Sequence, residues 1–121
     1  METVEIELAA MQIAAAKACQ LMKVLGNPNR LMILCQLSQG ERCVGELEAL
    51  LGIVQPTLSQ QLTVLRDEAL VSIRREGKNI YYQLTSPQTL AVVRTLYEQF
   101  CSNEMEMLRV SAKIGTRSST T

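Results

Sequence analysis

The chain has 121 residues, which suits one domain, and a formal net charge of zero, which argues against a polybasic protein that coats nucleic acid through charge alone. It contains no histidine, so histidine-based metal sites and the usual general base are excluded. No Cys-x-x-C pair and no glycine-rich phosphate loop occur either, so we expect neither an enzyme, nor a cofactor, nor a bound metal.

The first ten residues, METVEIELAA, carry acid where a secretory signal peptide carries base. No apolar run approaches the ~20 residues that cross a bilayer. We therefore expect a cytoplasmic protein without membrane contact, whose cysteines are thiols rather than disulfides. These cysteines are Cys19, Cys35, Cys43 and Cys101.

Two helices are predicted at the start of the chain. Residues 5–25 contain no Gly or Pro and are apolar on most faces of a helix. A domain of this size cannot cover such a helix alone, so we expect a partner subunit to cover it. After Gly26, Asn27 and Pro28 supply a cap and a first-turn proline for a second helix over 28–38.

Two shorter helices are predicted over 44–51 and 55–68, and the turn between them contains Gly52. This spacing is typical of a helix-turn-helix, whose second helix enters the major groove of DNA. Its residues expected in the core are Leu58, Leu62 and Leu65. The polar residues left on its outer surface are Gln55, Thr57, Ser59, Gln60 and Thr63. We expect this set to contact bases or phosphates; the alternative is that it only solvates an exposed helix.

A change to alternating apolar and polar residues over 71–84 predicts a β-hairpin, with a turn at EGKN. Its tip is basic. We expect the tip to contact the DNA backbone, or the minor groove beside the helix that enters the major groove. The residues that would make these contacts are Arg74, Arg75, Lys78 and Asn79.

Ser86 and Pro87 begin a last helix, expected over 87–110 and long enough to favour a dimer contact. The expected fold is mainly α with a small β-hairpin: a winged helix-turn-helix of five helices and a two-stranded wing. Residues 1–111 would form the DNA-binding and dimerisation domain, and 112–121 a disordered tail. A homodimer formed through the first and last helices would present two reading helices to pseudo-palindromic, double-stranded operator DNA.

The segments NPNRLMIL and GIVQPTLSQQLTVLRDEALV resemble the start of the second helix and the recognition helix of the ArsR/SmtB family of winged-helix repressors. The resemblance extends over residues 24–101 and implies a homodimer that a chemical signal releases from DNA. One departure is Val54, where many members have a capping Ser. We therefore expect Gln55 or water to bond the first N–H groups of the recognition helix.

The inducing signal is inferred from the cysteines. Arsenic-sensing members carry Cys-Val-Cys where this chain has Cys43, Val44 and Gly45, and zinc-sensing members use histidines that this chain lacks. The chain is more similar to the BigR/SqrR/HlyU subgroup, in which two cysteines respond to reactive sulfur. The Ile/Val-Leu-Cys and aromatic-Cys contexts of that subgroup match Cys35 and Cys101. The resemblance implies that persulfides or polysulfides cross-link these two thiols and thereby lower operator affinity.

Other interpretations stay open at this point. Each cysteine can be a small buried hydrophobe, and Cys19 is expected to be core or interface filler. Cys43, at the start of a helix, can be reactive. Three thiolates would also suit arsenite or another soft metal ion. A thiol-based enzyme or an interaction module that does not bind DNA are the remaining alternatives.

Overall fold

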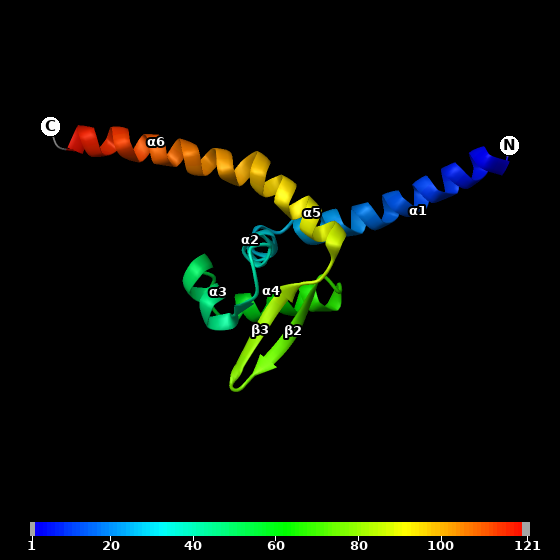
Figure 1. Ribbon diagram of the computed structural model, residues 1–121, viewed down its shortest axis with the longest axis horizontal. Helices are drawn as coiled ribbons and strands as arrows, with labels where there is room; N and C mark the ends of the chain where they lie inside the picture. The colour runs from blue at the N-terminus through cyan, green and yellow to red at the C-terminus, as the bar shows by residue number, and fades with distance from the viewer. Residues whose placement is uncertain (1, 120–121) are drawn as a thin grey trace.

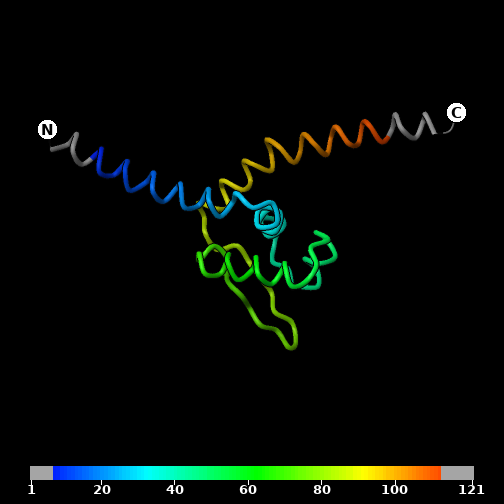
Figure 2. Tube along the Cα trace, turned by 180° about the vertical axis from the view of Figure 1, so that it is seen from behind, coloured from blue at the N-terminus to red at the C-terminus, as the bar shows by residue number. Residues whose placement is uncertain are grey.

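A computed structural model describes the backbone of residues 2–119 and the side chains of residues 7–112. Two long helical rods leave a small body in opposite directions: α1 (Glu2–Leu25), and a second rod that ends in α6 (Ser102–Ser119) (Figure 1). The body holds the shorter helices and a sheet whose hairpin points away from both rods, as the view from behind also shows (Figure 2). This arrangement confirms the predicted winged helix-turn-helix fold.

The first helices of the body begin and end close to their predicted bounds. α2 (Pro28–Leu37) begins at the proline because the Asn27 Oδ1 atom accepts hydrogen bonds from the backbone N–H groups of Asn29 and Arg30, at 2.9 and 3.1 Å. α3 (Val44–Leu51) ends at Gly52, whose φ of 67° is the left-handed conformation that favours glycine.

Arg30 joins the end of α1 to the body. Its Nε atom donates to the carbonyl of Val24 at 2.6 Å and its Nη2 atom to that of Lys23 at 3.3 Å. Its Nη1 atom donates to the side-chain carbonyl of Gln61 in α4 (Thr57–Asp67) at 3.0 Å. One guanidinium thus bonds the C-terminal carbonyls of α1, which have no partner within their own helix, and fixes α1 against α4.

Replacement of Arg30 by Ala is therefore expected to destabilise the fold by about 1.5–3 kcal/mol, the usual contribution of hydrogen bonds to a charged group. The free energy of unfolding in urea measures this loss. Arg66→Ala is the matched control, because Arg66 is exposed and makes no side-chain hydrogen bond or ion pair within residues 7–112; its effect should stay within about 0.5 kcal/mol. Equal losses for the two variants would contradict the role of Arg30.

The hydrophobic core lies where the helices of the body meet the sheet. Leu58, Leu62 and Leu65 of α4 are at most 1% exposed, which confirms the predicted inner face of that helix. Ile33 and Leu34 of α2 are 0% exposed and pack into the same cluster. α4 is therefore held by its apolar side with its polar side outward.

The sheet has one strand more than the sequence predicted. The hairpin strands β2 (Val71–Glu76) and β3 (Asn79–Leu84) pair as expected, and a short strand β1 (Arg42–Cys43) adds to the other edge of β3. Arg42 lies opposite Tyr82 and Cys43 opposite Tyr81 in this antiparallel pairing. The predicted two-stranded wing is confirmed, and β1 is an addition that the sequence did not predict, because a strand of two residues is too short to show an alternating pattern.

The last rod also differs from the single α-helix predicted over 87–110. It begins as α5 (Pro87–Leu96), where the Ser86 hydroxyl accepts a hydrogen bond from the Thr89 N–H at 3.2 Å. It then passes through a π-helical turn, η1 (Tyr97–Cys101), and continues as α6. Counted as one rod, α5 to α6 is the fifth helix. The helical backbone extends to Ser119, beyond the predicted end at 110. Most of the expected tail, 112–121, lies outside the residues whose side chains are described.

α1 is poorly covered within this chain. Every side chain from Glu7 to Gln20 is exposed, and only Val24 and Leu25 at the end of the helix are buried. By length and composition alone, the 19 residues Glu7–Leu25 would suffice to cross a membrane, at a mean hydropathy of 1.2. The sequence expectation that no apolar run approaches this length was therefore wrong. A helix that another protein chain covers has the same composition.

Candidate DNA interface and dithiol site

The two helices of the predicted DNA-reading unit pack as a helix-turn-helix. α3 leads through Gly52 and the buried Ile53 into α4. The outward side of α4 carries Ser59, Gln60 and Thr63, all exposed, while Thr57 is half-buried. The predicted contact residues of α4 thus lie together on the surface rather than inside the protein.

Gln55 acts as the expected substitute cap of α4. Its Oε1 atom accepts hydrogen bonds from the backbone N–H of Ser59 at 3.1 Å and from the Ser59 hydroxyl at 2.6 Å. Its Nε2 atom donates to the Glu48 carboxylate at 3.1 Å. Gln55, which replaces the missing serine cap, therefore uses both the oxygen and the nitrogen of its side-chain amide in hydrogen bonds. These bonds join α3 to α4.

The remaining polar side chains of α4 differ in whether they already make hydrogen bonds within the protein. The Thr63 hydroxyl donates to the Ser59 carbonyl one turn earlier, at 2.9 Å. Within the described side chains, Gln60 makes no side-chain hydrogen bond. An amide with unused donor and acceptor groups on an exposed helix is the group best placed to bond an adenine edge.

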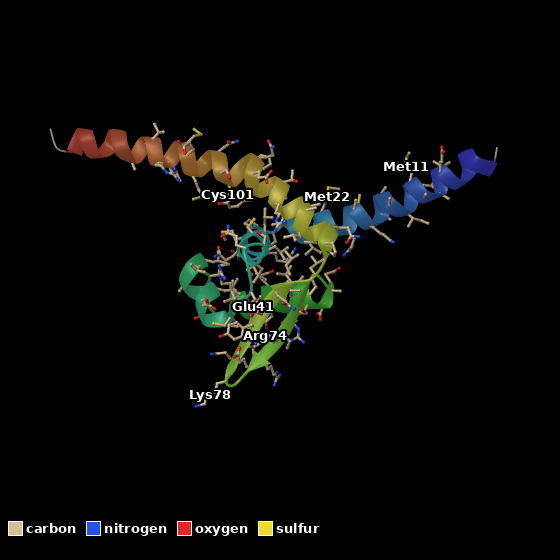
Figure 3. All side chains as sticks on the ribbon, in the orientation of Figure 1. Met11, Met22, Glu41, Arg74, Lys78 and Cys101 are labelled. Carbon is tan, nitrogen blue, oxygen red and sulfur yellow. The ribbon has the colours of Figure 1, made fainter. Side chains whose placement is uncertain are left out.

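The four predicted wing residues separate into two groups. Lys78 lies at the tip of the hairpin, beside Gly77 with its φ of 61° (Figure 3). Arg75, Lys78 and Asn79 are exposed and have no ion pair or side-chain hydrogen bond in the part of the chain that the structure describes. These three side chains can bond phosphates without first losing a partner.

Arg74, in contrast, is engaged within the protein. Its guanidinium bonds Glu41 at 2.6 and 3.2 Å and Glu76 at 2.7 Å, and it stacks 4.7 Å from the ring centre of Tyr81. The side chains of Glu41 and Arg74 converge in Figure 3. The Arg74 hydrogen bond lowers the pKa of the Glu41 carboxyl, so the pair stays ionised at neutral pH. Arg74 therefore ties the loop before β1 to the wing.

The two cysteines singled out by the sequence lie on one cavity. Cys35 of α2 and Cys101 at the end of η1 both line a hollow of about 610 Å³ between α2, α3 and the last rod. The apolar residues that line it are Leu31, Met32, Leu51, Leu96 and Phe100. Figure 3 places Cys101 where the last rod passes over α2. Both thiols are half-buried and unbonded to one another.

The environment affects the acidity of Cys35. Burial raises the pKa of the Cys35 thiol above its ordinary value, and the nearby Cys101 raises it further because two thiolate charges repel each other. A raised pKa keeps most of Cys35 in the less reactive thiol form at neutral pH.

Cys101 lies in the π turn of the last rod. A π turn holds one more residue than an α turn, so it rotates the residues after it relative to a regular helix. Cys101 is the last residue of η1, and it lines the cavity that Cys35 also lines. Such turns occur frequently at functional sites, and no pattern in the sequence predicted this one.

The other cysteines lie elsewhere. Cys19 is exposed on α1, and Cys43 is half-buried before α3, where its N–H donates to the Glu46 carboxylate at 3.0 Å. Within the residues that the structure describes, no three cysteine and carboxylate side chains gather closely enough to hold a metal ion.

Sequence reasoning missed two charged side chains of this region. Glu41 was overlooked because its partner Arg74 is 33 residues away in the chain. Glu46 bonds the backbone N–H of Cys43, and this bond lowers the pKa of its carboxyl. The spacing of Glu46, three residues after the capping position, was a readable signal of a helix start.

Comparisons with known proteins agree with this geometry. Residues 27–72 match the family described as bacterial regulatory protein, arsR family. The biofilm growth-associated repressor of Agrobacterium fabrum is 50% identical over 100 residues, which cover 83% of this chain and 86% of the relative. The solved transcriptional repressor BigR from Xylella fastidiosa has a TM-score of 0.72 and 47% identity, over 77% of this chain and 95% of that one. Reduced HlyU from Vibrio cholerae has a TM-score of 0.72 and 39% identity, over 76% of this chain and 97% of that one.

Proposed function

Because this chain belongs to the ArsR family of bacterial regulatory proteins, we propose that it is a homodimeric repressor whose affinity for operator DNA falls when reactive sulfur cross-links Cys35 and Cys101. The observation that carries the proposal is the shared cavity, in which a thiol of α2 faces the same space as a thiol of the last rod. The repressors among the relatives support the direction of regulation.

Binding to DNA is supported by the exposed polar side of α4 and the basic tip of the wing. The reading helix would place Gln60 and Thr63 at base edges in the major groove. Ser59 and Thr57 would bond phosphates or bases near the start of the helix, and Gln55 would hold that start in place. The wing would bond the backbone beside the site through Arg75, Lys78 and Asn79. Arg74 would act mainly by keeping the wing in position.

A homodimer is supported by the exposed apolar surface of α1. Burial of this surface against a second copy would remove its apolar side chains from water. We propose a cytoplasmic location for this DNA-binding protein, and there the surface requires such a cover. Two copies related by a two-fold axis would read a pseudo-palindromic operator, with reading helices ~34 Å apart.

The sulfur chemistry needs only the two thiols and a polysulfide. The first thiolate attacks a polysulfide sulfur, forms a new S–S bond and displaces a shorter polysulfide anion. The second thiolate attacks an inner sulfur of the bound chain and displaces hydrosulfide. The protein thiols are oxidised and the polysulfide is reduced, and the bridge keeps one or more of its sulfur atoms. A bridge with inserted sulfur spans more than the ~4.4–6.8 Å between Cα atoms that a simple disulfide permits.

A bridge would reach the DNA-reading helices through rigid elements. It would tie α2, which packs against α4, to the last rod, which we expect at the dimer contact. A change in the angle between rod and body would alter the spacing of the two reading helices, so that they no longer fit successive major grooves.

A gel-shift assay with DNA from the promoter region of this chain's own gene tests the proposal. Reduced protein should bind, polysulfide-treated protein should bind at least about tenfold more weakly, and dithiothreitol should restore binding. Arms with peroxide and with arsenite distinguish other inducers, since release by arsenite alone would assign the cysteines to a soft-metal sensor. Failure of the reduced protein to bind any part of this DNA would contradict a repressor.

Replacement of Arg75 and Lys78 by Ala should weaken operator binding to a similar extent on specific and non-specific DNA. Each lost phosphate contact should reduce the slope of log K against log salt by about 0.9, and each contact occurs twice in a dimer. Lys23→Ala is the control, because Lys23 is a basic residue in the last turn of α1 and not part of the wing. A salt dependence that stays unchanged would exclude the wing from the interface.

A further inference from the structure

The outward side of α4 carries two hydroxyl groups one helical turn apart, those of Ser59 and Thr63. Both side chains are exposed, and residues four apart lie on the same side of a helix. Ser59 lies in the first turn of α4, the part that a helix in the major groove brings to the base edges. A hydroxyl has one proton to donate and two lone pairs that accept, so its possible partners depend on where that proton is used.

The proton of the Ser59 hydroxyl is used within the protein. The Ser59 Oγ atom lies 2.6 Å from the Oε1 atom of Gln55, within the range of a well-formed hydrogen bond between two oxygen atoms. An amide oxygen has no proton to donate, so the Ser59 hydroxyl must be the donor of this bond.

Two further hydrogen bonds fix the orientation of the Gln55 amide. The backbone N–H of Ser59, which can only donate, bonds the same Oε1 atom at 3.1 Å. The Nε2 atom donates at 3.1 Å to the carboxylate of Glu48, which can only accept. Turning the amide over would set nitrogen against an N–H group at one end and oxygen against a carboxylate at the other. Gln55 therefore keeps its oxygen toward Ser59.

The proton of the Thr63 hydroxyl is also used within the protein. The Thr63 Oγ1 atom lies 2.9 Å from the backbone carbonyl oxygen of Ser59, which accepts and cannot donate. Both hydroxyls therefore present lone pairs, and no proton, to a molecule that approaches the outward side of α4.

The acceptor character of these hydroxyls limits what they can bond on DNA. Phosphate oxygens are acceptors, so neither hydroxyl bonds them in this arrangement. The base groups that donate in the major groove are the N6 amino group of adenine and the N4 amino group of cytosine, whereas guanine and thymine present acceptors there. The Glu48 carboxylate also places a negative charge beside Gln55, which disfavours a phosphate at this end of α4.

We propose that Ser59 and Thr63 read the amino groups of adenine or cytosine in the major groove, and that Gln55 is the positioning residue that restricts Ser59 to them. Each base pair has one such amino group, on one strand, so the contact distinguishes A·T from T·A and C·G from G·C. The inference rests on the proposed binding to DNA. It narrows that proposal by assigning Ser59 to bases rather than to phosphates.

Removal of single amino groups from the operator tests the contact. The operator is first obtained by selecting duplexes from a random-sequence DNA pool with the reduced, full-length protein. Purine in place of adenine lacks the N6 amino group, and 2-pyrimidinone in place of cytosine lacks the N4 amino group. At one base of each half-site, this removal should weaken wild-type binding about three- to tenfold, the usual effect of one hydrogen bond.

Variants of Ser59 assign this effect to its hydroxyl. Ser59→Ala keeps the backbone N–H that bonds Gln55, and its affinity should be insensitive to the same removal. Ser59→Thr, the matched control, keeps a hydroxyl and should remain sensitive. Thr63→Ala should lose sensitivity at a second base. All proteins are measured on the same duplexes, so an effect of the analogue on the duplex itself cancels.

Reversal of the base pair at the Ser59 position, from A·T to T·A or from C·G to G·C, tests the role of Gln55. Gln55→Ala frees the Ser59 proton, so the hydroxyl can also donate to an acceptor of guanine or thymine. The reversal should then weaken binding less than about twofold, against about threefold or more for wild type. The readout is a ratio of two affinities of one variant, so stability lost with the cap does not alter it.

The failures of the two proposals are distinguishable. Wild-type binding that is unchanged by removal of any amino group, or equal sensitivity of Ser59→Ala and wild type at every base, would overturn the inference and leave the proposed function intact. Full discrimination by Gln55→Ala would overturn the positioning role of Gln55. A reduced wild-type protein that selects no sequence from the pool would overturn the proposed function as well.

Discussion

Replacement of Cys35 or Cys101 by Ser should leave operator binding by the reduced protein within about twofold of wild type and abolish its release by polysulfide. The serine hydroxyl is close in size to the thiol, so the half-buried positions should keep their packing, but it does not form a sulfur bridge. Fluorescence anisotropy of labelled operator DNA, with and without polysulfide, measures the two affinities. Loss of the response should be complete in either variant because the bridge needs both thiols.

Cys19→Ser and Cys43→Ser are the matched controls for this experiment. Neither thiol lines the cavity shared by Cys35 and Cys101, so both controls should respond to polysulfide as wild type does. A response that survives in Cys101→Ser and disappears in Cys43→Ser would move the sensing site to the start of α3.

Leu62→Ala should destabilise the protein by about 2–5 kcal/mol, the usual cost of a large-to-small change in a core. Leu62 is 1% exposed and anchors the inner side of the reading helix, so its loss leaves a cavity under α4. Against a total stability of about 5–15 kcal/mol, this is a large loss for a single side chain. Urea unfolding followed by circular dichroism measures it.

The next residue along the helix should behave in the opposite way. Thr63 is exposed, so Thr63→Ala should change stability by no more than about 0.5 kcal/mol. If Thr63 contacts DNA, the same substitution should lower operator affinity by about 1 kcal/mol or more. A variant that loses stability and keeps its DNA affinity would show that the inner and outer sides of α4 have been exchanged.

Much of the fold could be predicted because its signals are local. Asn27 and Ser86 each precede a proline and cap a helix where expected, and the leucine spacing of α4 identifies its buried side. The capping role of Gln55 was one of two expectations, Gln55 or water, that came from the family resemblance, in which many members have a serine at the position of Val54. These features depend on neighbours within four residues.

The features that were not predicted depend on contacts between distant parts of the chain. β1 exists only because Arg42 and Cys43 meet Tyr82 and Tyr81 across the sheet. The role of Arg74 depends on its ion pair with Glu41. The sequence analysis considered only the charge of this arginine and therefore grouped it with the predicted DNA contacts. The π turn at Cys101 has no local sequence signal. The cysteine pair itself was identified by resemblance rather than by spacing.

Mass spectrometry of peptides from polysulfide-treated protein tests the central claim most directly, because it reads the bond itself. We predict that the peptides carrying Cys35 and Cys101 are joined within one subunit, with a mass that includes one or more inserted sulfur atoms and that dithiothreitol removes. Persulfide groups found only on separate peptides, or a bridge that joins Cys19 or Cys43 instead, would contradict the account.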